Sequence, residues 1–374
     1  IVVRMGSKTK PVNEKFRVLT ALGMIFVICG HYGIEAFSFG GLYPYESFHM
    51  PLFMFISGYF FKRENASTIS AVLNYIVKKI KHLLIPYFAW NMVYGGMFIA
   101  LTKLGFSNTE STPLNLHTLF VLPFLQAPGF SFNSAAWFVM ALFFAEIVNC
   151  LIRYACTKAQ VSHDWIWLLL YFTIAVASIV YSQLNYETVG ELGIFRNLYL
   201  LFWYGFGTFY HDKLEPIDKR IPFGTAIICN VILTAALIFF VGSPATNVWS
   251  SLFDEPAFIV IARAALGIWF WLRIVDELMP VLGKGRALLF VGEHSFSYMM
   301  HQCITGMAIN ALILCFFPQV INEAMFKSNR WYAGDFGAAR IIYLILILAI
   351  IACAIIFVDK VVDGIKRRKQ KDAL

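Results

Sequence analysis

Residues 341–358 read IIYLILILAIIACAIIFV, a run without a single charged side chain. In an α-helix, a run of this length can cross most of the ~30 Å hydrocarbon core of a bilayer. Comparable apolar runs occupy 18–36, 47–62, 83–103, 134–153, 165–183, 196–211, 222–242, 256–272 and 287–317. The chain is therefore predicted to be an all-α, polytopic integral membrane protein of about ten transmembrane helices.

The composition supports this prediction. Of the 374 residues, 59% are hydrophobic and 14% are charged, whereas a soluble domain carries about a quarter charged residues. The lipid bilayer is thus the expected surroundings of most of the chain. The net charge of +8 does not indicate a nucleic-acid partner, because the basic residues form short clusters between apolar runs rather than one continuous face.

Basic residues also predict the topology. If both termini are cytoplasmic, 24 of the 30 Lys and Arg residues fall in inner segments and five fall in outer ones, leaving Arg263 alone within a span. We expect a cytoplasmic segment over 1–16, a membrane domain over 17–360 and a basic cytoplasmic tail over 361–374. No cleavable signal is expected, so the first helix would direct insertion into the inner or plasma membrane.

Two runs have special features. The ninth, 287–317, is long enough to contain a break. The stretch 111–133 is a candidate re-entrant or interfacial segment and is not one of the ten predicted spans. The seven cysteines have neither metal-ligand nor redox spacing, and no metal is expected. P-loop, G-x-S-x-G and H-E-x-x-H motifs are absent from the sequence, so most soluble chemistries have no support.

Ionisable residues at membrane depth are costly and often mark a functional cavity. His31 lies ~20 Å along the first predicted helix, counted from residue 17 at 1.5 Å per residue. Histidine can exchange a proton near neutral pH and can act as a general base toward a hydroxyl. A buried histidine that only donates a hydrogen bond to a neighbouring helix is the alternative, and position alone leaves both interpretations open.

Further candidates surround this position. Glu46 and His49 follow the first outer loop, where we expect His49 near His31 and Glu46 either orienting an imidazole or solvated in the loop. His301, in the ninth run, reaches a depth like that of His31 and would share its cavity. Glu146 and Arg263 are expected either to form a mutual ion pair or to join the chemistry.

Several motifs resemble the membrane acyltransferase-3 family, in particular its fucose-4-O-acetylase-like branch. The resemblance spans most of the chain, and its most specific block is His49-Met50-Pro51-Leu52-Phe53-Met54-Phe55-Ile56-Ser57-Gly58-Tyr59-Phe60-Phe61-Lys62. The other matching segments are Val27-Ile28-Cys29-Gly30-His31, Leu83-Leu84-Ile85-Pro86-Tyr87-Phe88, Ala136-Trp137-Phe138-Val139 and Ser297-Tyr298 with His301.

The resemblance implies ten helices and transfer of an acyl group, usually acetyl from cytoplasmic acetyl-CoA, to a hydroxyl of an extracytoplasmic cell-envelope polysaccharide or lipid-linked sugar. His31 would correspond to the essential first-helix histidine of the family. The family usually has a basic residue eleven positions earlier, where this chain has Thr20. Arg17 lies within ~40° of the same helix face as His31 and is the expected substitute.

The resulting hypothesis is a membrane O-acetyltransferase. His31 would act as a general base or a transient acyl carrier, with His49, Glu46 and His301 in supporting roles. Arg17, Arg63, Lys78, Lys81 and Arg263 would attract the donor, although the positive-inside rule alone explains the first four. A proton-coupled transporter or flippase for a glycan intermediate or small solute is the main alternative, and a sensory or assembly protein is a third.

Overall fold

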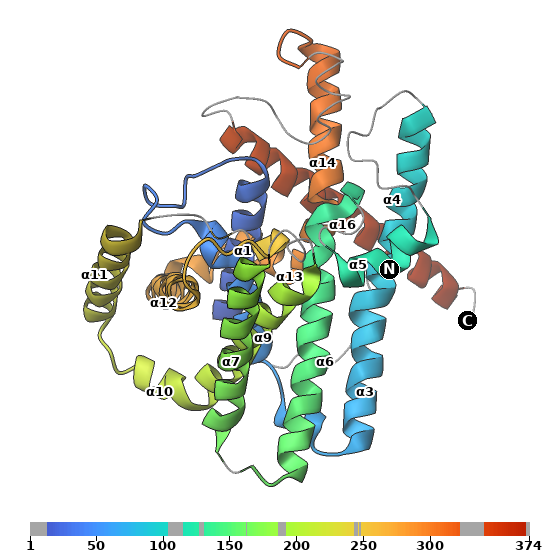
Figure 1. Ribbon diagram of the computed structural model, residues 1–374. Coiled ribbons are helices and arrows are strands. Elements are labelled where there is room, and N and C mark those ends of the chain that lie inside the picture. The colour runs from blue at the N-terminus through green and yellow to red at the C-terminus, as the bar shows by residue number, and fades with distance from the viewer. Residues whose placement is uncertain are drawn as a thin grey trace. The chain divides into compact units, whose positions relative to one another are not determined.

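A computed structural model describes residues 13–103, 115–126, 131–161, 163–185, 192–242, 246, 248–321 and 340–371 (Figure 1). Every regular element in these ranges is a helix, and the only β-type pairing there is an isolated bridge between Gln126 and Leu192. The all-α prediction is therefore confirmed for the described part of the chain.

Seven helices within the described ranges are long and apolar enough to cross a bilayer. They are the continuous helix Ile69–Lys103, α6 (Trp137–Lys158), α7 (Asp164–Leu184), α11 (Phe223–Val241), α12 (Ala257–Leu282), α14 (Ser295–Phe316) and residues 340–365 of α16 (Arg340–Lys371). This number of apolar helices identifies the chain as a membrane protein, as predicted.

Three more predicted runs fold as helices that fall short of those limits. They are α1 (Glu14–His31), α2 (His49–Tyr59) and α9 (Gly193–Phe209). The first turn of α1 carries several charges, while α2 has 11 residues and α9 has 17, below the ~20 that a perpendicular span needs. The count of ten and the cytoplasmic location of both termini thus stay predictions.

Several boundaries differ from the predicted ones. The third run is only part of a longer helix in which α3 (Ile69–Lys79) passes through the π-helical turn η3 (Ile80–Leu84) into α4 (Ile85–Lys103). The ninth run does contain a break, at His294, between α13 (Arg286–Glu293) and α14. The segment predicted as a basic tail continues α16 as far as Lys371.

The remaining elements are short. The described part of 111–133 contains the π-turn η4 (His117–Val121), α5 (Leu122–Leu125) and the beginning of η5 (Ser131–Ala136), none long enough to span. The others are η1 (Tyr45–Ser47), η2 (Arg63–Ala66), η6 (Tyr210–Leu214), α10 (Glu215–Asp218) and η7 (Val248–Ser250).

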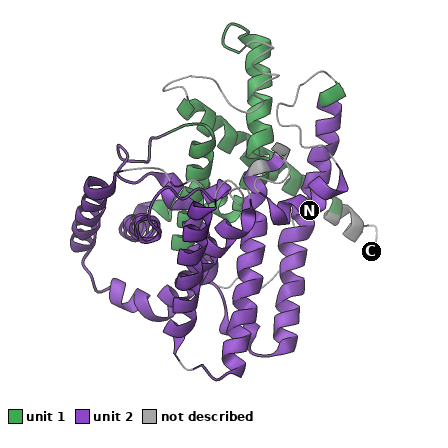
Figure 2. Cartoon of the chain, viewed as in Figure 1, with its two compact units in different colours: residues 1–34, 102–109, 282–374 green, residues 35–101, 110–281 purple. Residues whose placement is uncertain are grey.

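The chain divides into two compact units, coloured separately in Figure 2. One contains residues 1–34, 102–109 and 282–374, and therefore α1, α13, α14 and α16; the other contains 35–101 and 110–281. The predicted single membrane domain over 17–360 thus comprises parts of both units.

In the first unit, α1 is the helix against which α13 and α14 pack. Gly292 of α13 has no room for a side chain, because a Cβ there would overlap the backbone carbonyl of Arg17. Further along α1, the Tyr32 ring lies against Gly306 of α14. Tyr298 of α14 donates a hydrogen bond to the Leu348 carbonyl of α16 at 3.1 Å. Small residues thus allow close helix approach, as is common in membrane bundles.

In the second unit, α2 and α9 contact through their backbones. A Cβ on Gly58 would overlap the carbonyl of Tyr204, and a Cβ on Gly207 would overlap the carbonyl of Phe55. Thr208 donates a hydrogen bond to the Gly58 carbonyl at 2.8 Å. The glycines let this short helix pack tightly on α9, which α7 also covers.

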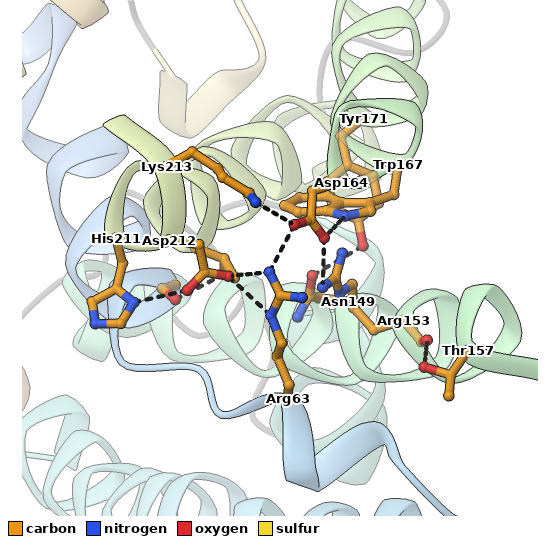
Figure 3. A network of polar contacts seen from close by, with 12 residues as sticks. Arg63, Asn149, Arg153, Thr157, Asp164, Trp167, Tyr171, His211, Asp212 and Lys213 are labelled. Carbon is orange, nitrogen blue, oxygen red and sulfur yellow. Dashed lines mark hydrogen bonds and ion pairs between the residues drawn. The ribbon is translucent and has the colours of Figure 1, made fainter. Parts of the chain in front are cut away.

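A polar network joins the predicted cytoplasmic ends of this unit (Figure 3). Arg63 in η2 binds Asp212 in η6 through Nε and Nη2, at 3.1 and 2.6 Å, and Asp164 at the start of α7 at 2.8 Å. Arg153 of α6 lies 3.4 Å from Asp164, and Lys213 lies 3.7 Å from it. Four segments distant in the sequence are therefore held together by two carboxylates.

The Asp212 carboxylate is also 2.9 Å from Nδ1 of His211. Burial alone would raise the pKa of Asp212, but the hydrogen bonds from His211 and Arg63 and their charges outweigh it, so the pKa lies below its ordinary value. The network thus stabilises the ionised form of Asp212.

Glycine packing predicts opposite effects for two identical substitutions. Gly207→Ala should destabilise the protein by about 1–3 kcal/mol or more, because the new methyl group overlaps the backbone of α2. Gly96→Ala, in α4 with open space around it, should leave stability unchanged or raise it by about 0.5–1 kcal/mol. Thermal unfolding in detergent measures both, and equal effects would contradict the close α2–α9 contact.

The lowered pKa of Asp212 predicts that the stability of the protein depends on pH. Because its pKa is lower in the folded than in the unfolded state, its contribution is present above the unfolded value of about 3.9 and is lost as the pH falls through the folded value. Asp212→Asn should therefore lower the midpoint of thermal unfolding at pH 7, with the difference from wild type vanishing in strong acid. A pH-independent difference would refute this origin, and exposed Asp363→Asn is the control.

Candidate functional site

His31 is the last residue of α1, and it retains exposed surface although protein atoms surround it closely. The helix ends there because the amide of Tyr32 bonds the carbonyls of Ile28 and Cys29, and Gly33 then adopts a φ of +60°. Glycine has little steric penalty in this conformation. The local sequence therefore presents an imidazole at an accessible helix end.

The neighbouring residue fixes this end of α1 against α14. The Tyr32 hydroxyl donates a hydrogen bond to the carbonyl of Gln302 at 3.3 Å, and its ring lies 5.7 Å from the ring of Tyr343 in α16. His31 and His301 each precede one partner of the Tyr32–Gln302 contact. The structure thus brings the two helices that carry these histidines together at this level, and His301 is half-buried there.

A third contact comes from the beginning of α16. Arg340 Nη1 donates a hydrogen bond of 2.8 Å to the carbonyl of Gly33, two residues beyond His31. Tyr343, one turn later, donates to the Asn310 side chain of α14. The end of α1 is consequently held by the Gln302 carbonyl of α14 and by the Arg340 side chain of α16 within one unit, which limits where the imidazole can move.

His49 and Glu46 belong to the other unit, so their predicted proximity to His31 stays a prediction. His49 begins α2, and its Nδ1 is 2.5 Å from the carbonyl of Tyr45. Because a carbonyl only accepts, Nδ1 carries the proton and the neutral ring has its lone pair on Nε2. Burial raises the pKa of the Glu46 carboxyl above its ordinary value, so Glu46 is more readily protonated than a solvated loop carboxylate.

Arg17 is the basic residue of α1 nearest to the missing family position. Its guanidinium lies 3.7 Å from Glu293 of α13, and both side chains retain exposure, at 24% and 46%. Thr20 uses its hydroxyl within the helix, donating to the carbonyl of Phe16 at 2.7 Å. Arg17 is therefore a partly exposed cation on this helix, as Lys15 is, and its solvent-accessible ion pair with Glu293 is weak.

The basic candidates of the second unit differ in how far their charges are neutralised. Lys78 and Lys81 are exposed and have no ion pair among the described residues. Arg63 instead binds both Asp164 and Asp212, and most of its charge is compensated. Lys79, between the two exposed lysines, turns inward to Glu146.

The expected mutual pairing of Glu146 and Arg263 is wrong. Glu146 of α6 pairs with Lys79, because α3 and α6 run side by side (Figure 1). Arg263 of α12 pairs with Glu255 at 2.9 Å and donates to the carbonyl of Gly242 at 2.8 Å. Each charge has found a partner on an adjacent segment, which removes the cost of burial that an unpaired charge would carry.

Sequence reasoning missed the residues that position His31, namely Tyr32, Gln302 and Arg340. Their hydrogen bonds are accepted by backbone carbonyls, and a sequence motif does not show which carbonyl accepts such a bond. The expectation that Arg196 belongs to an outer segment between helices is also incorrect, since α9 begins at Gly193 and includes Arg196 at 1% exposure. Arg196 stands at the very start of an apolar run, and this position was the sequence feature that could have indicated its place inside the helix.

The chemistry available at this site is that of an accessible imidazole on a fixed helix end. Such a group can accept a proton from a hydroxyl or attack an activated acyl carbon. The described residues contain no group of three or more His, Cys, Asp or Glu side chains arranged to hold a metal ion.

Comparison with known proteins identifies the family. Neither the curated proteins nor the solved structures contain a match. A family model described as an acyltransferase domain matches residues 13–359, nearly the whole chain. The fucose-4-O-acetylase-like branch stays a prediction, but the coverage is sufficient for the broader assignment: this chain belongs to the acyltransferase-3 family, whose members are membrane acyltransferases.

Proposed function

We propose that the protein is an O-acetyltransferase of the inner or plasma membrane. It would transfer an acetyl group from cytoplasmic acetyl-CoA to a hydroxyl of an extracytoplasmic cell-envelope polysaccharide or lipid-linked sugar. The observation that carries the proposal is the exposed His31 imidazole, which Tyr32 and Arg340 hold in place at the end of α1.

Two routes are chemically balanced. In the first, His31 takes the hydroxyl proton while the acceptor oxygen attacks the thioester carbonyl, the C–S bond breaks and CoA leaves as a thiolate. In the second, an imidazole nitrogen attacks the thioester carbonyl, and the C–S bond breaks so that CoA leaves as a thiolate. The acceptor oxygen then attacks the acyl carbon, the C–N bond breaks, and the freed imidazole takes the hydroxyl proton. His301, on the helix that Tyr32 contacts, and His49 and Glu46 are the supporting acid–base candidates.

The donor carries several phosphates, so its site needs accessible cations. The exposed Arg17, Lys78 and Lys81 are the proposed contacts. Arg63 and Arg263 each face a carboxylate of the chain already, and the proposal gives them no direct donor contact. No metal takes part in the proposed reaction.

A transporter or flippase for a glycan intermediate or small solute is the second candidate. It is favoured by the Lys79–Glu146 pair, in which Glu146 is 4% exposed and its Oε2 has no hydrogen-bond partner. Buried carboxylates of this kind serve as proton relays in carriers. Dependence of the modified product on acetyl-CoA separates the two candidates, because a carrier transfers no acyl group.

Substitution of His31 tests the catalytic role. His31→Ala and His31→Gln should each lower acetyl transfer by about 10²–10⁴-fold, because neither side chain can act as a base near neutral pH or carry an acyl group. Mass spectrometry of the acceptor gives the rate, and expression should stay near wild type. His163→Gln, at an exposed histidine before α7, is the matched control. Near-normal activity of His31→Gln would make His31 a structural hydrogen-bonding residue.

Donor binding gives an independent prediction. Arg17→Ala should weaken acetyl-CoA binding about tenfold, as expected for loss of one charge-assisted hydrogen bond worth about 1.5 kcal/mol. Lys158→Ala, at another exposed basic position predicted to be cytoplasmic, is the control. Calorimetric titration of the purified protein measures both. Equal weakening in the two variants would mean that Arg17 acts only through the net charge of that face.

A further inference from the structure

Arg196 is a buried cation that the proposed mechanism does not use. It lies in the first turn of α9 at 1% exposure, and its guanidinium carbon is 4.3 Å from the ring centre of Trp137. Nη1 donates to the carbonyl of Trp249 at 2.6 Å, but Nε is buried without an acceptor. The π-face and one carbonyl compensate only part of the charge.

Other buried arginines of the same unit show what normally completes such a site. Arg153, Arg263 and Arg273 are 5–8% exposed, and each lies within 4 Å of a carboxylate. Arg196 is the most buried of the four, yet no described residue places a carboxylate within ion-pair distance of it. Arg263 and Arg273 are parallel cases, since each also donates to a main-chain carbonyl in addition to its carboxylate.

Two helix ends add to the positive potential at Arg196. α9 begins at Gly193 and α6 at Trp137, and neither has an acidic residue in its first turn or a hydrogen bond from its N-cap side chain. One amide of the first turn of α9, that of Arg196, donates to Ser251 Oγ at 3.2 Å. Each N-terminus carries the equivalent of about half a positive charge. The guanidinium belongs to the first turn of α9 and lies over the ring of the first residue of α6, so both helix dipoles direct their positive ends toward this region.

We propose that Arg196, with the N-termini of α6 and α9, binds an anionic group, a carboxylate or a phosphate, on the acyl acceptor. The proposal rests on the proposed function and narrows its substrate class to an acidic or phosphorylated glycan. The Nε atoms of Arg263 and Arg273 are also buried without an acceptor, so what distinguishes Arg196 is that no described residue supplies it with a carboxylate. Its Nε supplies a directed donor, and buried guanidinium groups suit both kinds of oxyanion.

This anion site lies far from the predicted cytoplasmic end of its unit. Arg196 and Asp212 lie at opposite ends of the helix formed by α9 and η6, and 16 residues at 1.5 Å per residue separate them by ~24 Å. The Asp212 end is the predicted cytoplasmic end, so Arg196 lies toward the predicted outer face. The acceptor, not the donor, is expected there.

Acceptor selectivity tests the site. Purified full-length protein is given acetyl-CoA and one of three acceptors: a glucuronate-containing disaccharide, its carboxyl-reduced counterpart, or a sugar phosphate. Wild type should show a KM at least tenfold lower for one of the two anionic acceptors, and which one it is identifies the anion. Arg196→Gln should remove that preference while leaving the KM for acetyl-CoA unchanged, and Arg196→Lys should retain part of it. Arg273→Gln, at another buried arginine, should keep the preference.

Equal KM values of the wild type for charged and neutral acceptors would overturn the anion site and leave the acetyltransferase proposal standing. If no acceptor is acetylated, the proposed function fails, and thermal stabilisation by glucuronate or inorganic phosphate, but not by glucose, still decides whether the anion site exists. The same measurement on wild type decides the matter if Arg196→Gln does not fold.

An internal counter-ion is the rival explanation. Glu187 and Glu191 precede α9 and lie outside the described residues. Double-mutant cycles between Arg196→Gln and Glu187→Gln or Glu191→Gln measure their coupling. Additive effects on thermal stability are expected. Strong coupling to either glutamate, together with unchanged acceptor preference in Arg196→Gln, would assign the anion to the chain itself and overturn the proposal.

Discussion

The cost of placing a charge at membrane depth governs this structure. Lys79 pairs with Glu146, and Arg263 pairs with Glu255. At the predicted cytoplasmic ends, the carboxylates of Asp164 and Asp212 bind cations from several segments. These pairs determine which helix ends can adjoin in the second unit, while the glycine contacts of α2 and α9 determine how closely the helices approach between those ends. Ion pairs therefore stabilise the ends of the helices in this unit, and close backbone packing stabilises the contacts between those ends.

Hydropathy was enough to predict the helices but not their pairing. Each apolar run became a helix, and the length of the ninth run correctly indicated a break. The continuous helix over 69–103 was not foreseen, because the Lys78–Lys81 cluster interrupts the apolar pattern without interrupting the backbone hydrogen bonds. Glu146 and Arg263 were recognised as buried charges, but their partners depend on which helices are neighbours, and a single sequence does not contain that information.

In the candidate site, too, the sequence predicted the unusual residues but not the contacts that they make. His31 was conspicuous because an imidazole inside an apolar run is unusual, and His301 followed from its equivalent depth. Tyr32 and Arg340 were not predicted, since both act by donating to main-chain carbonyls and such contacts leave no residue pattern. Arg196 was counted among the outer loop charges because its apolar run begins at that residue, whereas the helix itself begins at Gly193.

The π-helical turn η3 constrains the length of the segment Ile80–Leu84. A π-turn holds one more residue than an α-turn, so it rotates everything after it by about 100° relative to a regular helix. Lys79, before η3, faces α6, and Asn91, after it, bonds Asn133 at 2.9 Å. Both alignments depend on that extra residue. A one-residue deletion within Ile80–Leu84 would restore an ordinary helix and turn one set of side chains toward lipid, so the length of this segment is constrained more tightly than its composition.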